Sequence, residues 1–86
     1  MARRERPPWW SWELEISPHA CKRMVERGLT EVDLRLMLGE AQHIHPDVEP
    51  GRWTVLARLA GRPWEIIVEP DALRLHVVVI TAYELD

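Results

Sequence analysis

Residues 17–30 constrain the fold more than any other stretch, because they hold both the start and the end signal of one short helix. The Ser17 hydroxyl can accept a hydrogen bond from a free backbone N–H in the first helical turn. Pro18 follows at the first helical position, where its missing N–H costs nothing. Gly28 supplies the left-handed residue that ends many helices. The stretch therefore predicts a helix that begins at Pro18 and ends before Gly28.

Side chains of different character lie on two faces of this helix. The apolar face follows the spacing i, i+3, i+4, i+7 and comprises Cys21, Met24, Val25 and Gly28. We expect the Cys21 thiol to be buried there and inert. On the other face His19, Arg23 and Arg27 are each four residues apart, so they stack with a drift of about 40° per step. One imidazole and two guanidiniums therefore form a single row.

Size and composition limit the class of protein. The chain has 86 residues, which is one domain with a small core. With 47% hydrophobic and 29% charged residues it resembles a folded domain rather than a disordered one. Its single cysteine excludes an internal disulfide and suits a reducing compartment. No apolar run reaches the length of a membrane span, and no secretory signal is visible, so we expect a cytoplasmic protein without a membrane partner.

The charge is uneven along the chain. A net charge of −3 argues against a protein that binds nucleic acid over its whole surface. The first helix nevertheless carries Lys22 and the row of His19, Arg23 and Arg27 against a single acid, Glu26. A local basic face is therefore compatible with an acidic protein.

Residues 1–13 form a separate N-terminal arm, and residues 14–86 form the domain. The arm is first basic and then aromatic, with Arg3, Arg4, Arg6, Trp9, Trp10 and Trp12. Its prolines disfavour regular structure. We favour an interpretation in which the tryptophans pack over one edge of the domain. The alternative is a stacking platform for bases, or a surface for a partner.

The remaining pattern indicates an α+β domain. Residues 12–16 alternate apolar and acidic side chains, which is typical of a half-buried strand. Thr30 starts a second helix over residues 31–38, with Asp33 as its capping partner. That helix is apolar on most sides, so it is either enclosed by the core or covers a partner.

The second half of the chain predicts strands joined by short turns. The strands are expected at residues 52–60, 64–69 and 74–83, with a loop or a short strand within 40–51. Short connections favour antiparallel pairing. We therefore predict two short helices packed on an antiparallel sheet of three to five strands. The apolar run at residues 77–80 predicts a central strand that is covered on both faces.

A metal site is the weaker of the chemical options. His43 and His45 are two residues apart, so on a strand they would share a side, and Asp47 continues the series. A zinc site needs a third protein ligand, which His76 or Cys21 could supply only through the tertiary fold. Because no C-x-x-C or H-E-x-x-H motif is present, we expect neither a metal nor a cofactor.

From residue 14 to residue 84 the chain resembles a bacterial family of small domains of unknown function. The family signature H-A-x-x-R-M-x-x-R-G is matched by His19-Ala20, Arg23-Met24 and Arg27-Gly28, and its T-A-Y ending is matched by Thr81-Ala82-Tyr83. That family is distantly similar to BrnT and RelE/ParE-type toxins, which share an αα-ββββ fold. The resemblance implies a RelE-toxin-like fold. Many such toxins cleave RNA without a metal and are silenced by a cognate antitoxin, whereas ParE-like members do not cut RNA.

The residues of the signature suit metal-free RNA cleavage. Histidine transfers protons near neutral pH, so His19 is the candidate general acid or base. Arg23 and Arg27 are candidates for stabilising charge on the phosphate. Thr81 and Tyr83 are two apart on a strand, share a face, and could donate hydrogen bonds, with Tyr83 also stacking on a base. In the alternative interpretation this helix face only meets solvent, and Arg23 and Arg27 pair with Glu26 and Glu31.

The sequence thus predicts a toxin-like, metal-independent endoribonuclease of a toxin–antitoxin-type system. RNA is the expected substrate and a cognate antitoxin the expected partner, and a homodimer is left open. The alternative function is a non-catalytic protein- or nucleic-acid-binding module of the same fold. In that case the helix at 31–38 and the arm would dock a partner.

Overall fold

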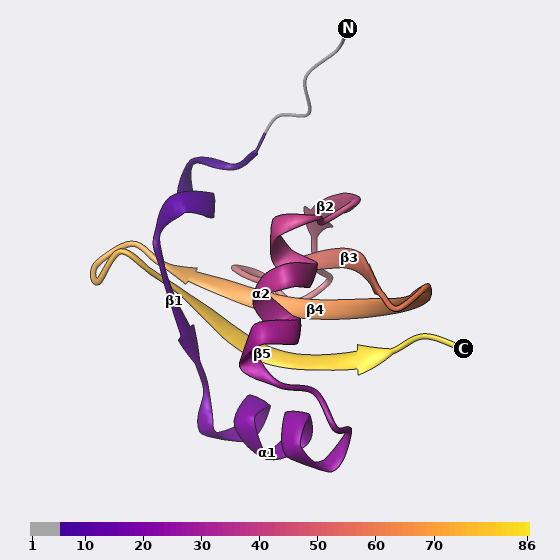
Figure 1. The fold of residues 1–86 in the computed structure, drawn as a ribbon. Helices are drawn as coiled ribbons and strands as arrows, with labels where there is room; N and C mark the ends of the chain where they lie inside the picture. Colours follow the sequence, from indigo (N-terminus) through magenta and orange to yellow (C-terminus); the bar gives the residue numbers. More distant parts are fainter. Residues whose placement is uncertain (1–5) are drawn as a thin grey trace, which may run out of the picture.

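The computed structural model describes residues 6–86, in which two helices cover one side of a five-stranded sheet (Figure 1). α2 runs across the sheet, and α1 lies beside β5 at its lower border in that view. The elements are the 3-10 turn η1 (Pro8–Ser11), β1 (Glu13–Ile16), α1 (Pro18–Glu26), α2 (Glu31–Gly39), β2 (His43–Pro46), β3 (Trp53–Leu59), β4 (Arg62–Asp71) and β5 (His76–Glu84). The α+β class predicted from the sequence is confirmed.

The sheet is mixed, so the prediction of a purely antiparallel sheet is wrong. Its strand order is β1-β5-β4-β3-β2, and the pairs from β5 to β2 are antiparallel. β1 runs parallel to β5, with Glu13 beside His76 and Ile16 beside Val79. Short turns dictate antiparallel pairing only between consecutive strands. β1 instead pairs with the last strand, and both helices lie between the two in sequence.

α1 starts and ends where the sequence predicts, but it buries a different face. The Ala20 N–H donates to the Ser17 hydroxyl over 3.0 Å, and Gly28 has a φ of 69°. Ala20 and Met24, four residues apart, are the side chains of α1 that are buried. The predicted apolar face is therefore wrong for three of its four members, because Cys21 and Gly28 are exposed and Val25 is 80% exposed. The helix packs mainly along one strand, β5, which covers only a narrow stripe of it.

α2 is one-sided rather than enclosed. Thr30 and Asp33 form both hydrogen bonds of a capping box, each 3.1 Å long. Leu34 and Met37 are buried against the sheet. Two apolar side chains on the opposite side, Val32 and Leu36, face solvent.

The core lies between the helices and one face of the sheet. The largest fully buried side chains are Leu34, Met37, Ile66, Val55, Val68 and Val79. In β5 the buried Val77 and Val79 alternate with the half-buried Val78 and Ile80. The prediction that this run is covered on both faces is therefore wrong. Both helices contribute their buried residues to the same core.

The aromatic part of the arm packs on the domain, as the favoured interpretation predicts. Trp9 is buried, and Trp10 and Trp12 pack against the core. The Trp9 ring lies 5.5 Å from that of Trp53 on β3. The Arg6 guanidinium stacks 4.9 Å from the centre of the Trp10 ring. Arg3 and Arg4 lie outside the described residues.

Candidate functional site

α1 is fastened to the second half of β5, where β1 no longer runs beside that strand. The Ser17 N–H donates to the Val79 carbonyl over 3.1 Å, and the Ser17 hydroxyl to the Ile80 carbonyl over 3.4 Å. At the other end of the helix, Arg27 Nη1 donates to the Ala82 carbonyl over 2.8 Å. These contacts hold the whole length of α1 beside residues 79–82.

Arg27 joins the two parts of the predicted site. Its acceptor, Ala82, is the residue between Thr81 and Tyr83. The last strand, β5, therefore lies beside α1. One guanidinium N–H group is committed to this bond, and the other donors of Arg27 have no partner among residues 6–86 and remain for a ligand.

Arg23 makes a surface ion pair one turn earlier. Its Nη1 lies 2.7 Å from Glu26 Oε1, and both side chains are partly exposed. Such pairs are worth about 0–1 kcal/mol, so a phosphate could displace Glu26 readily. The second pair expected from the sequence, between Arg27 and Glu31, does not form, because Glu31 pairs with Arg35 over 2.9 Å.

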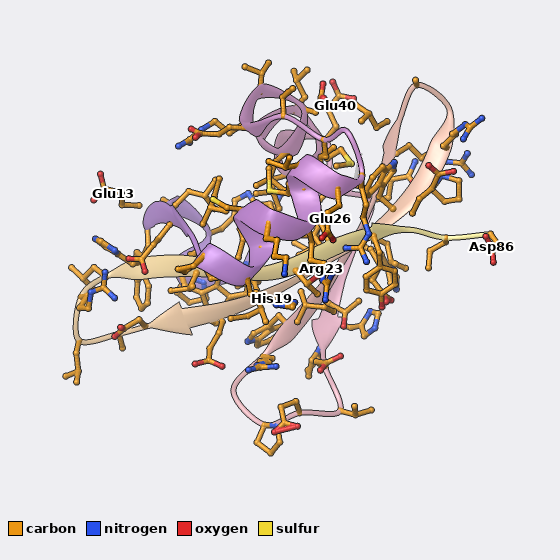
Figure 2. All side chains as sticks on the ribbon, turned by 90° about the horizontal axis from the view of Figure 1, so that it is seen from below. Glu13, His19, Arg23, Glu26, Glu40 and Asp86 are labelled. Carbon is orange, nitrogen blue, oxygen red and sulfur yellow. The ribbon has the colours of Figure 1, made fainter. Side chains whose placement is uncertain are left out.

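His19 stands at the exposed start of the row. Figure 2 shows His19, Arg23 and Glu26 following one another along α1. Within residues 6–86 the imidazole makes no hydrogen bond, and its side chain is open to solvent. The ring is therefore free to exchange protons with a bound molecule.

Thr81 and Tyr83 lie on the sheet face that the helices leave uncovered. Val79 pairs with Val68 and Thr81 with Ile67, so Ile80 is an extra residue that shifts the alternation of β5. After this bulge Ala82 is buried in the core, and Thr81 and Tyr83, both half-buried, share the opposite face. The row on α1 and these two side chains thus flank the same stretch of β5 from different sides.

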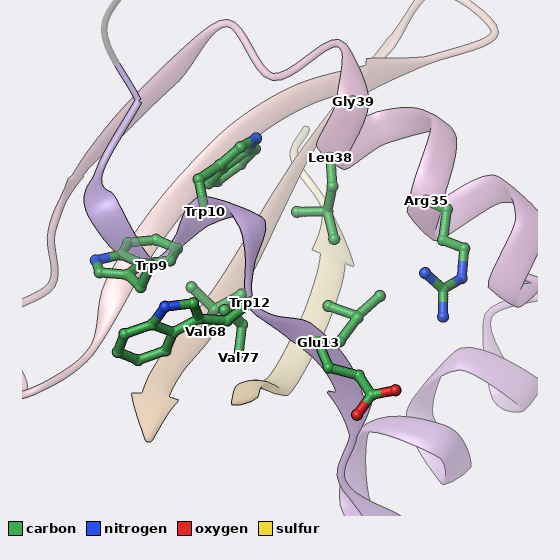
Figure 3. A pocket seen from close by; sticks show the side chains of 10 residues that line it. Trp9, Trp10, Trp12, Glu13, Arg35, Leu38, Gly39, Val68 and Val77 are labelled. Atoms are coloured by element: carbon green, nitrogen blue, oxygen red, sulfur yellow. The ribbon is translucent and has the colours of Figure 1, made fainter. Parts of the chain in front are cut away.

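The marked hollows of the surface are elsewhere. The first has a volume of about 370 Å³ and lies between the arm tryptophans on one side and Arg35 and Leu38 of α2 on the other (Figure 3). The second, about 430 Å³, lies between α1 and the start of α2 and is lined by Ile16, Cys21 and Val25, among others. The five predicted site residues line neither hollow.

Sequence reasoning missed an ionic cluster that ties β1 to β5. The Glu15 carboxylate accepts from Arg74 and lies 2.9 Å from His76 Nδ1, while His76 Nε2 lies 3.2 Å from Glu13. The hydrogen bond from His76, and after it that from Arg74, lowers the pKa of Glu15. The alternation in residues 12–16 placed both acids on one face, but only the parallel pairing brings His76 opposite them.

Among the described residues, His43 and His45 have no further metal ligand beside them. The two rings are 5.9 Å apart on β2. Asp47 accepts instead from the Glu49 N–H and the Thr54 hydroxyl, and these two bonds, in that order, lower its pKa. In the described part of the chain, no three His, Cys, Asp or Glu side chains are grouped closely enough to hold a metal ion.

The helices in residues 6–86 are too short or too polar to span a bilayer.

Comparison with known families supports the predicted membership in a family of small domains of unknown function. A family described as a domain of unknown function, DUF4258, matches residues 16–84. The chain belongs to this family. No curated protein and no solved structure matches the chain. The DUF4258 match contains α1, β5 and the whole predicted site, and it leaves η1 and most of β1 outside.

Proposed function

We propose that this DUF4258 domain is a toxin-like, metal-independent endoribonuclease of a toxin–antitoxin-type system, acting where α1 meets β5. The observation that carries the proposal is the bond from Arg27 to the Ala82 carbonyl. It holds a row of one imidazole and two guanidiniums beside the strand segment that contains Thr81 and Tyr83. The distant resemblance of the family to BrnT and RelE/ParE-type toxins, drawn from the sequence, suggests the same reaction and an antitoxin partner, by analogy of fold.

The chemistry is an attack of the ribose 2′-oxygen on the adjacent phosphorus. His19 takes the proton of the 2′-hydroxyl. Arg23 and the free donors of Arg27 stabilise the charge that develops on the phosphate oxygens. The bond to the 5′-oxygen breaks, and this oxygen leaves with a proton from water. The products are a 2′,3′-cyclic phosphate and a 5′-hydroxyl, so neither a metal nor an added nucleophile is needed.

The test is RNA cleavage by the purified domain in EDTA. General acid–base catalysis contributes roughly 10²–10⁴-fold, so we expect His19→Ala to lower the rate by at least about 100-fold. Arg27→Ala should also lose activity. Its matched control is Arg58→Ala, because the Arg58 guanidinium likewise donates to a backbone carbonyl, that of Gly61, in an exposed turn.

Two results would contradict the proposal. If RNA stays intact after incubation with the wild-type protein, the domain is not an endoribonuclease. Equal cleavage by wild type and His19→Ala, with equal thermal stability, would move the site away from α1.

A second candidate is a non-catalytic module that binds a partner. The observation that favours it is the position of the first hollow, which is bounded by the arm tryptophans and α2 and lies away from the row on α1. Solvent-facing Val32 and Leu36 extend the apolar surface of α2. The cleavage assay separates the candidates, because a binding module leaves RNA intact.

A further inference from the structure

β1 is a strand at the border of the sheet with an open outer edge. Within residues 6–86 it pairs with β5 alone, and in Figure 1 no strand runs along its other side. Edge strands offer unpaired N–H and C=O groups on which another chain can build. At the opposite border β2 ends at Pro46, which has no N–H to offer.

The backbone of β1 shows which groups are free. The Glu13 N–H donates to the Leu75 carbonyl, and the Ser17 N–H to the Val79 carbonyl. Along a strand the backbone groups of successive residues point to opposite sides. Leu14 and Ile16 therefore direct their N–H and C=O groups outward, away from β5. This arrangement provides two donors and two acceptors for an added strand.

The side chains of β1 differ sharply between its two faces. Leu14 and Ile16 lie on the core face, are half-buried, and line the first and the second hollow respectively. Glu13 and Glu15 lie on the other face. Glu15 is engaged by His76 and Arg74, whereas the Glu13 side chain is 77% exposed despite its contact with His76. An added strand would meet apolar surface on one face and negative charge on the other.

We propose that β1 binds an extended peptide segment as a sixth strand, and that this segment alternates apolar and basic residues. Its backbone pairs with Leu14 and Ile16. Its apolar side chains continue the surface of Leu14 and Ile16 toward the hollow beside Trp12. Its basic side chains lie beside Glu13, where opposite charges on neighbouring strands attract. The inference deepens the binding candidate and does not require RNA cleavage.

A second copy of the chain is the poorer occupant of this edge. Two antiparallel β1 strands would place Glu13 and Glu15 of one copy beside the same acids of the other. Like charges directly opposite one another destabilise a strand pair. The acids therefore disfavour self-association at β1 and favour a basic strand.

The experiment uses a blocked synthetic peptide, Lys-Val-Lys-Leu-Lys-Val-Lys, and NMR of the full chain. Two peptides serve as controls: one with Glu in place of every Lys, and one with the original residues in a non-alternating order. We expect the Lys peptide to shift the Leu14 and Ile16 amide signals and to slow their hydrogen exchange, with weaker effects from both controls. No binding, equal binding of all three, or shifts confined to β2 would each overturn the proposal.

Charge reversal at one residue then tests the face that recognises the peptide. Glu13→Arg should weaken binding of the Lys peptide by about threefold to tenfold and strengthen binding of the Glu peptide. Glu49→Arg makes the same change of charge in an exposed turn away from β1 and should alter neither. If Glu13→Arg binds both peptides as wild type does, the charge complementarity is wrong. Glu13→Arg should cleave RNA at the wild-type rate. The peptide-binding proposal and the RNA-cleavage proposal can therefore fail independently of each other.

Discussion

The junction of α1 with β5 and the outer edge of β1 differ in what their polar groups do. At the junction, charged side chains are engaged within the chain: Arg27 with the Ala82 carbonyl and Arg23 with Glu26. At the edge, the outward backbone groups of Leu14 and Ile16 have no neighbouring strand among residues 6–86. The junction is conspicuous in the sequence, and its two arginines are partly engaged within the chain. The edge is inconspicuous in the sequence, and its outward backbone groups are open. A row of charged residues therefore does not point to an open strand edge.

The largest expected effect tests whether the junction is packed more firmly than the edge. Met24, 4% exposed, anchors α1 in the core, whereas Leu14 on β1 is half-buried. Met24→Ala should lower the free energy of unfolding by about 2–5 kcal/mol, because it removes buried methylene groups and leaves a cavity. Leu14→Ala should cost less than half of that. Urea unfolding measures both, and equal losses would erase the contrast.

A smaller effect is expected when α1 loses its cap while β1 stays paired. Ser17→Ala removes the acceptor of the Ala20 N–H and the donor to the Ile80 carbonyl, but it keeps the backbone bond to Val79. We expect a loss of about 0.5–2 kcal/mol in the free energy of unfolding. Ser17→Thr keeps the hydroxyl and is the matched control. Hydrogen exchange should accelerate in the first turn of α1 and stay unchanged in β1; faster exchange in both would mean that the two regions open together.

The smallest effect concerns the β1 side and depends on pH. The pKa of Glu15 is lowered from its usual value of 4.5, first by the hydrogen bond from His76 and then by that from Arg74. The folded state therefore favours the charged carboxylate. This stabilisation is complete above the unfolded pKa and is lost as the pH falls through the lower folded pKa. The difference in unfolding free energy between wild type and Glu15→Gln should thus shrink as the pH falls below about 4.5.

The comparison of wild type with Glu15→Gln separates the pH-dependent contribution of Glu15 from that of Asp47. The pKa of Asp47 is lowered as well, so both proteins lose that contribution equally in acid. Glu40→Gln, at the exposed end of α2, serves as the control for removal of one surface charge. A difference that persists unchanged to pH 2 would show that Glu15 acts through packing rather than charge.

Local signals in the sequence were sufficient to predict the positions of both helices and of the strands in the second half of the chain. Caps such as Ser17 and Thr30 are read correctly because they depend on neighbours within three residues. The packed face of α1 was misjudged because apolar spacing does not say which strand the helix meets. The parallel pairing of β1 was missed because nothing in residues 13–16 identifies a partner so far along the chain.

The candidate site was predictable in its residues but not in its shape. The spacing of His19, Arg23 and Arg27 fixes the row, and the structure adds the bond to Ala82. Thr81 and Tyr83 share a face as their spacing predicts, but only the extra residue in β5 decides which face. The first hollow was missed because it depends on how far α2 stands from the arm, and the second because it depends on how α1 and α2 pack beside β1.

The pairing of Glu13 with His76 also sets an order of events during synthesis. Translation proceeds at about 5–20 residues per second, so β1 leaves the ribosome several seconds before its partner strand. Throughout that interval β5 covers neither edge of β1. A peptide that pairs with β1 during translation must leave the edge that β5 takes, whereas a peptide on the outer edge can stay.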